Sequence, residues 1–141
     1  MGLRNEKTEF YLDQISRSDR RTFRSSVSHL FKFLSSEYKN NDAYNKYKGE
    51  NEKWLTWPPQ HSLRNWQLPD IEEETKSLTF YIYKNIASQD DIWVDRYLQL
   101  LFLDSGNTAI GELNSIFLGY LKKIIQEIMF AGIAASSRRY S

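Results

Sequence analysis

Residues 18–39, SDRRTFRSSVSHLFKFLSSEYK, hold the clearest structural signal in the chain. Apolar side chains recur in this stretch at spacings of three and four residues, which places them on one face of an α-helix. They are Phe23, Val27, Leu30, Phe31, Leu34 and Tyr38. The pattern predicts one amphipathic helix over 18–39, with Ser18 as its N-cap and the apolar face in the core.

A second face of this predicted helix, with the residue before it, carries positive charge. The cations are Arg17, Arg20, Arg21, Arg24, Lys32 and Lys39. Only Asp19 and Glu37 oppose these six cations within 17–39, whereas a helix selected for solubility usually mixes both signs. Serine hydroxyls lie between the cations and can donate to phosphate oxygens. We therefore predict a nucleic-acid-binding stripe made of these six residues; the alternative is an ordinary solvated helix face.

The whole chain predicts an all-α fold. Its 141 residues suit a single domain over 1–141, and the helical spacing of its apolar residues favours a bundle of about five helices. The fourth of these, over 88–103, has so little polar sequence that we expect it to be the central, most buried helix. The fifth is expected over 108–135.

The segment between the second and third predicted helices has two parts. Residues 40–53 are polar and lack an apolar period, which predicts an exposed loop or a frayed helical extension. A Trp/Pro-rich connection follows, and its proline pair forbids a regular helix there. We expect its three indoles to lie in the core, since apolar surface of that size is costly to leave in water. They belong to Trp54, Trp57 and Trp66.

Composition excludes several kinds of chemistry. The chain has no cysteine, which removes disulfides, thiolate nucleophiles and thiolate metal sites, and it has only two histidines. The most apolar window, 116–135, is interrupted by charged and amide side chains, so it is a poor membrane span. The chain also lacks the order of a signal peptide. We expect a cytoplasmic protein that is not an enzyme, needs no cofactor or metal, and has no membrane role.

One pair of residues keeps an enzymatic alternative open. Arg24 and His29 have the spacing, arginine followed after four residues by histidine, of the motif in HEPN-type ribonucleases. That resemblance implies a helical bundle that dimerises and pairs two such motifs over an RNA backbone. Because His29 adjoins Leu30 on the apolar face, the alternative is a partly buried structural histidine. His61, in the Pro-rich connection, has no assigned partner.

A small, cysteine-free, all-helical chain with one cationic face resembles the small helical subunit of CRISPR effector complexes. The resemblance rests on length, class and charge. It implies a non-catalytic bundle that holds guide RNA or a displaced target strand by the backbone. The expected partners are then RNA or single-stranded DNA, other subunits of a ribonucleoprotein complex, and copies of the chain itself. A helical adaptor that binds only protein is the third class left open.

Overall fold

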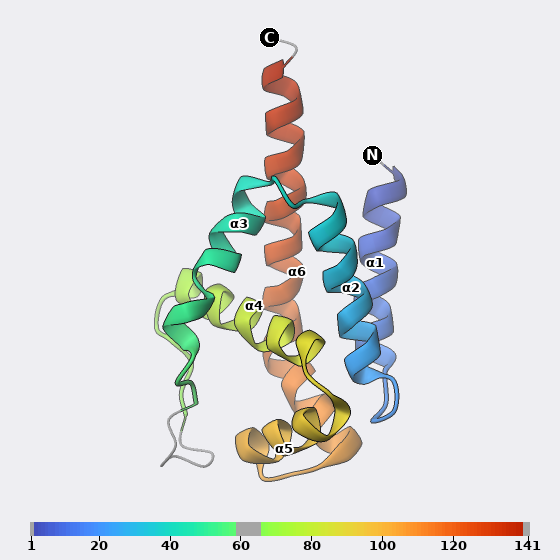
Figure 1. Ribbon diagram of the computed structural model, residues 1–141, viewed down its shortest axis with the longest axis vertical. Helices are drawn as coiled ribbons and strands as arrows, with labels where there is room; N and C mark the ends of the chain where they lie inside the picture. The colour runs from blue at the N-terminus through green and yellow to red at the C-terminus, as the bar shows by residue number, and fades with distance from the viewer. Residues whose placement is uncertain (1, 59–65, 140–141) are drawn as a thin grey trace.

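The computed structural model describes residues 2–58 and 66–139, and the side chains of 2–5 and 133–139 lie outside that description. Within these ranges the chain forms six α-helices, one short 3₁₀ helix and no strand, packed as a single helical bundle (Figure 1). The elements are α1 (Gly2–Arg17), α2 (Phe23–Glu37), α3 (Asp42–Gly49), η1 (Asn51–Trp54), α4 (Glu72–Ser88), α5 (Asp91–Phe102) and α6 (Gly106–Arg139). The predicted all-α class is confirmed.

Helix α4 is the centre of the bundle. Residues 75–83 are all buried, and α4 packs against α2, α3, η1 and α6. Helix α5, which corresponds to the predicted central helix, lies at one end of the bundle instead (Figure 1). It leaves Ile92 66% exposed. The prediction that the 88–103 helix is the most buried is therefore wrong.

Polar side chains inside α4 explain why its position was not predicted. Thr79 Oγ1 donates to the Thr75 carbonyl at 2.7 Å, and the Ser77 hydroxyl accepts from the Trp54 indole N–H at 2.8 Å. Burying a polar group without a hydrogen-bond partner costs free energy, so polar residues in a sequence normally indicate surface positions. Buried polar groups that have partners avoid this cost. Helix α4 therefore occupies the core with a sequence that is only partly apolar.

The polar segment after α2 is a packed helix rather than an exposed loop. The Asn41 side chain accepts from the Tyr44 N–H at 3.0 Å, which caps α3. Asn41 Nδ2 also donates to the Ile128 carbonyl on α6 at 2.8 Å. Tyr44 and Tyr47 are 3% and 1% exposed and pack on Phe80 of α4. The sequence predicted five helices, and α3 is the sixth.

The predicted helix over 18–39 is interrupted at its start. Helix α1 continues to Arg17, residues 18–22 form a turn, and α2 begins only at Phe23. The Asp19 carboxylate accepts from the Arg21 and Thr22 N–H groups at 2.9 and 3.1 Å, and such local bonds compete with helix formation. The hydrogen bond from the Arg21 backbone N–H is the main cause of the lowered Asp19 pKa. Ser18 donates to the Ile15 carbonyl at the end of α1, so it is no N-cap.

Two tryptophans fix the ends of the Trp/Pro-rich connection, whose residues 59–65 with His61 lie outside the described ranges. The Trp54 indole bonds Ser77 of α4. The Trp66 indole N–H donates to the Leu101 carbonyl at 2.8 Å, and its ring stacks on Phe117 of α6 at 6.0 Å. Trp54, Trp57 and Trp66 are each partly buried and pack against the core rather than inside it, so the prediction for their indoles holds only in part. None of the described helices is both long and apolar enough to cross a membrane.

Candidate nucleic-acid interface

The structure places the six predicted stripe residues in three segments of the chain. Arg17, Arg20 and Arg21 lie at the end of α1 or in the turn after it, while Arg24 and Lys32 lie on α2. Lys39 follows α2 in the turn to α3. The predicted continuous stripe on one helix is therefore wrong as geometry, because the 18–22 turn divides it.

Three of the arginines are held in ion pairs. Arg17 pairs with Asp13 at 3.2 Å along α1. Arg20 and Arg24 pair with Asp95 and Asp91 of α5, both at 2.9 Å. These pairs join the α1–α2 turn and the start of α2 to α5. The charge of these arginines is largely compensated within the protein.

The other three predicted cations, Arg21, Lys32 and Lys39, are exposed. None of them forms an ion pair with a residue in the described ranges. Of the three, Lys32 lines a cavity between α2 and α4. It therefore marks the best candidate surface.

Lys32 lines a groove between α2 and α4, closed at one side by α3, with a volume of about 250 Å³. We call it the α2–α4 groove. Its polar lining is Ser28, Lys32, Ser35, Lys84 and Ser88, and its apolar lining is Phe31, Tyr44 and Ala87. Helical spacing explains the α2 wall, because positions separated by three and four residues share one face. The groove thus combines two lysines and three hydroxyls around an apolar floor.

Positive charge accumulates beside this groove without compensation. Burial lowers the Lys84 pKa, and the positive charge of Lys48 on α3 lowers it further. No carboxylate contributes an opposing effect on Lys84. Neither Lys48 nor Lys84 has an ion-pair partner among the described residues. Lys84 of α4 thus shares the groove with Lys32 of α2 and lies near enough to Lys48 of α3 to feel its charge, so three helices contribute cations here.

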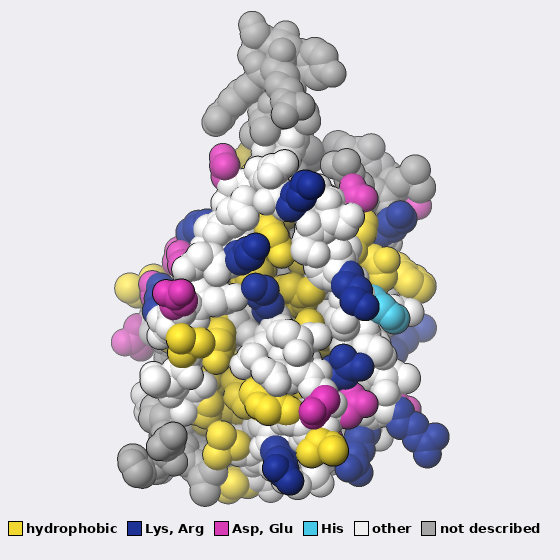
Figure 2. Space-filling view, viewed as in Figure 1, with side chains coloured by type: hydrophobic (Ala, Val, Ile, Leu, Met, Phe, Trp, Pro, Cys, Tyr) yellow, Lys and Arg dark blue, Asp and Glu magenta, His cyan; other side chains and the backbone are white. Residues whose placement is uncertain are grey.

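Figure 2 shows this face of the molecule. Lys and Arg side chains lie across its middle, with hydrophobic side chains visible between them, whereas Asp and Glu side chains lie near its borders and in one patch below the middle. Sequence reasoning missed Lys84, because the predicted site was confined to cations within 17–39. No sequence spacing relates residues on α2 to residues about fifty positions later on α4.

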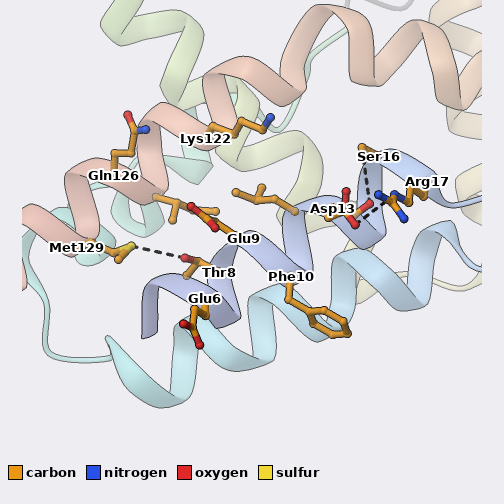
Figure 3. Close-up of a pocket in the computed structure, with 12 residues that line it drawn as sticks. Glu6, Thr8, Glu9, Phe10, Asp13, Ser16, Arg17, Lys122, Gln126 and Met129 are labelled. Carbon is orange, nitrogen blue, oxygen red and sulfur yellow. Dashed lines mark hydrogen bonds and ion pairs between the residues drawn. The ribbon is translucent and has the colours of Figure 1, made fainter. Parts of the chain in front are cut away.

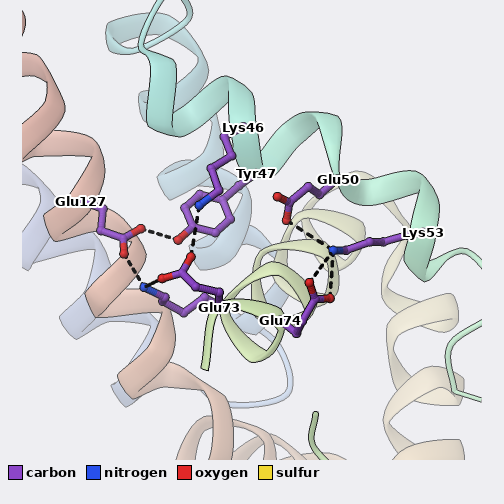
Figure 4. Close-up of polar contacts among 8 residues, drawn as sticks. Lys46, Tyr47, Glu50, Lys53, Glu73, Glu74 and Glu127 are labelled. Carbon is purple, nitrogen blue, oxygen red and sulfur yellow. Dashed lines mark hydrogen bonds and ion pairs between the residues drawn. The ribbon is translucent and has the colours of Figure 1, made fainter. Parts of the chain in front are cut away.

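Lys46, Tyr47 and their neighbours serve the fold rather than the groove (Figure 4). Lys46 pairs with Glu73 at 3.1 Å. Tyr47 donates its hydroxyl to Glu127 of α6, and Lys76, whose side chain is 7% exposed, pairs with both Glu127 and Glu73. We call Tyr47, Glu73, Lys76 and Glu127 the Lys76 cluster. It joins α3, α4 and α6.

Acid should weaken this cluster. Hydrogen bonds from Lys76 and then Lys46 lower the Glu73 pKa below its ordinary value of 4.5. A carboxylate with a lowered folded-state pKa stabilises the fold above its ordinary pKa, and this contribution is lost as the pH falls through the folded value. We expect the midpoint of urea unfolding to decrease below about pH 4.5. Glu73→Gln should flatten that decrease, and an unchanged pH dependence in the variant would contradict this assignment.

A larger cavity, about 680 Å³, lies between α1 and α6 (Figure 3). Its α1 side carries Glu6, Glu9 and Asp13, and its α6 side carries Lys122 and Gln126. The carboxylates would repel a phosphate backbone. This cavity is therefore a poorer candidate for nucleic acid than the smaller α2–α4 groove.

The structure does not bring Arg24 and His29 together within one chain. Five residues correspond to about 140° around a helix of 3.6 residues per turn. Arg24 is held by Asp91, and His29 is exposed rather than partly buried as expected for a structural histidine. In the described part of the chain, no group of three or more His, Asp and Glu side chains could hold a metal ion.

The fold and the groove together define a helical bundle with a cationic, hydroxyl-lined groove. A scan against protein-family models finds no match, and searches of curated proteins and of solved structures find no significant match either. The resemblance to the CRISPR small subunit accordingly stays a prediction.

Proposed function

We propose that this protein binds the phosphate backbone of RNA or single-stranded DNA through the α2–α4 groove and the adjoining Lys48. The observation that carries the proposal is the convergence of Lys32, Lys48 and Lys84 from three helices, unpaired with any described carboxylate. Lysines beside short hydroxyl side chains are the usual donors to phosphate oxygens. The serines of the groove supply those hydroxyls.

In this proposal the binding is structural rather than catalytic. The groove offers cations, hydroxyls and an apolar floor, and these groups can hold a ligand by charge, hydrogen bonds and apolar contact. A subunit of a ribonucleoprotein complex, with other subunits and copies of itself as neighbours, is the setting that suits such binding. Arg21 and Lys39 are exposed as well, but they lie in the turns before and after α2 and outside the groove lining, so they are not counted among its phosphate contacts.

Salt dependence tests the proposal. Three phosphate contacts on a single strand predict that log K falls with log salt concentration with a slope of about −2, which is about 20-fold in affinity between about 50 and 200 mM salt. The double variant Lys32→Gln, Lys84→Gln should reduce the slope to about −0.7, because one contact remains. Fluorescence anisotropy with a labelled single strand measures both slopes.

Two variants control for net charge. Lys122→Gln removes an exposed lysine of α6 that lines the α1–α6 cavity, so the slope should stay near that of the natural chain. Arg24→Gln removes a cation of the predicted stripe that already pairs with Asp91. Its main effect should therefore be a lower free energy of unfolding, with little change in the salt slope. An unchanged slope in the Lys32, Lys84 double variant would reject the proposed site.

Protein docking is a second candidate, supported by the outer face of α5. Ile92, Leu100 and Leu103 are 66%, 38% and 56% exposed. At 100° per residue Ile92 and Leu100 are about 80° apart and share one face of α5, and Leu103 follows the helix as its left-handed C-cap residue. If this face carries the function alone, no nucleic-acid affinity is expected even at low salt.

A further inference from the structure

The chemistry of the α2–α4 groove differs between its rim and its floor. The rim carries Lys32 and Lys84 with serine hydroxyls, and the floor carries Phe31, Tyr44 and Ala87. A phosphate gains from the rim but nothing from an apolar floor, because phosphate oxygens require donors. An apolar, planar part of the ligand gains from that floor.

The two rings of the floor are held rigidly. Phe31 and Tyr44 each pack in a T-shaped arrangement with Phe80 of α4. Their ring centroids lie 5.4 and 5.9 Å from that of Phe80, and both interplanar angles are 70°. They are only 6% and 3% exposed, so a small part of each ring is open to the groove. An incoming aromatic group can pack against that part, and ring pairs favour T-shaped or offset-stacked arrangements. The rings need no reordering before contact, which lowers the entropic cost of binding.

The size of the groove limits what can enter it. Its volume of about 250 Å³ corresponds to about eight water molecules at about 30 Å³ each. It lies below the usual range for drug-sized ligands, about 300–1,000 Å³. One nucleobase with part of its sugar is of this order, whereas a duplex keeps its bases stacked inside and presents only their edges within its grooves.

We infer that the α2–α4 groove takes one unstacked nucleobase of a single strand on the Phe31, Tyr44 and Ala87 floor while Lys32 and Lys84 hold the adjoining phosphates. This inference rests on the proposed function and adds the ligand form to it. The floor provides apolar ring atoms and a methyl group, so it should discriminate little between bases. A duplex can reach the rim lysines but cannot place a base in the recess.

Three ligands of equal length test the inference, within the range of about 4–16 nucleotides that single-strand sites cover. They are an intact single strand, the same strand with abasic sugars throughout, and the matching duplex. At one fixed salt concentration we expect the abasic strand to bind about fivefold more weakly than the intact strand, since a base–aromatic contact is lost. The salt slope of these two single strands should be the same, because their phosphates are the same.

Filling the recess provides the matching variant. Ala87→Phe adds a ring to the floor without changing charge, so it should remove the difference between intact and abasic strands and keep the salt slope. Ser115→Phe, on an exposed position of α6 outside the groove, should keep that difference. The comparison of strands on the natural chain needs no variant to fold.

The possible outcomes separate the two proposals. Equal affinity for intact and abasic strands, with a salt slope near −2 that falls in the Lys32, Lys84 double variant, overturns base insertion and leaves backbone binding in place. A duplex that binds as tightly as the intact strand has the same consequence. No binding to any of the three ligands at about 50 mM salt overturns both proposals.

Discussion

Truncation of Glu127 to alanine should destabilise the protein by about 3 kcal/mol, a loss far greater than its half-exposed position suggests. Glu127 accepts from the Tyr47 hydroxyl and from the Lys76 ammonium. Tyr47 is 1% exposed and the Lys76 side chain 7%, so both donors would be left inside the protein with fewer partners. Buried donors without acceptors lose the solvation that they had in the unfolded chain. Urea unfolding followed by circular dichroism measures the change.

A matched variant separates burial from charge. Glu72 of α4 pairs with Lys123 of α6, and the two side chains are 54% and 55% exposed. Glu72→Ala also removes a carboxylate and its contact with a lysine between the same two helices, but this pair is exposed to solvent. The free energy of unfolding should therefore fall by no more than about 1 kcal/mol. Tyr47→Phe removes only the hydroxyl and should cost about 1 kcal/mol. Equal losses for Glu127→Ala and Glu72→Ala would show that the cluster does not act as a buried unit.

Phe80→Ala should be the most destabilising single substitution in α4, at about 3–5 kcal/mol. Phe80 is fully buried, and its ring contacts Phe31, Tyr44 and Tyr47, so it joins α2 and α3 to the central helix. Its removal leaves a cavity at the meeting point of three helices. The same cavity lies beneath the two rings of the groove floor, so ligand affinity should fall as well.

The control for this prediction lies on α5. Ile92→Ala removes a side chain from the helix that the sequence predicted to be central, but Ile92 is 66% exposed. We expect a change within about 0.5 kcal/mol, as for surface substitutions in general. A large loss at Ile92 together with a small loss at Phe80 would reverse the roles assigned to α4 and α5.

Helical class was predictable because the apolar spacing in α2 and α6 is long and regular. Phe23, Val27, Leu30 and Leu34 are all buried, as their period requires. The relative burial of α4 and α5 was not predictable from apolar content. Helix α4 satisfies its polar side chains internally or through Trp54 and Glu127, and these partners lie far away in the sequence.

The candidate site was predictable only in part, because charge along a sequence does not show which charges are compensated. Arg20 and Arg24 were chosen for their position, yet Asp95 and Asp91 lie more than sixty residues away. Lys32 was identified correctly as an exposed cation, but its partner across the groove, Lys84, shares no local pattern with it. Distances between helices decide both outcomes, and spacing within one helix carries no information about them.

The division of the groove between α2 and α4 has a consequence for dissection of the protein. A peptide covering 18–39 contains the four groove residues of α2, including Lys32 and Phe31, but it lacks Lys84, Tyr44 and Ala87. A ligand that spans both walls binds only the assembled chain, so it stabilises the folded state by mass action. The melting temperature should then rise with ligand concentration. Binding of nucleic acid would therefore depend on the assembled tertiary structure. The basic segment alone would bind nucleic acid only weakly and without selectivity, as a polycation.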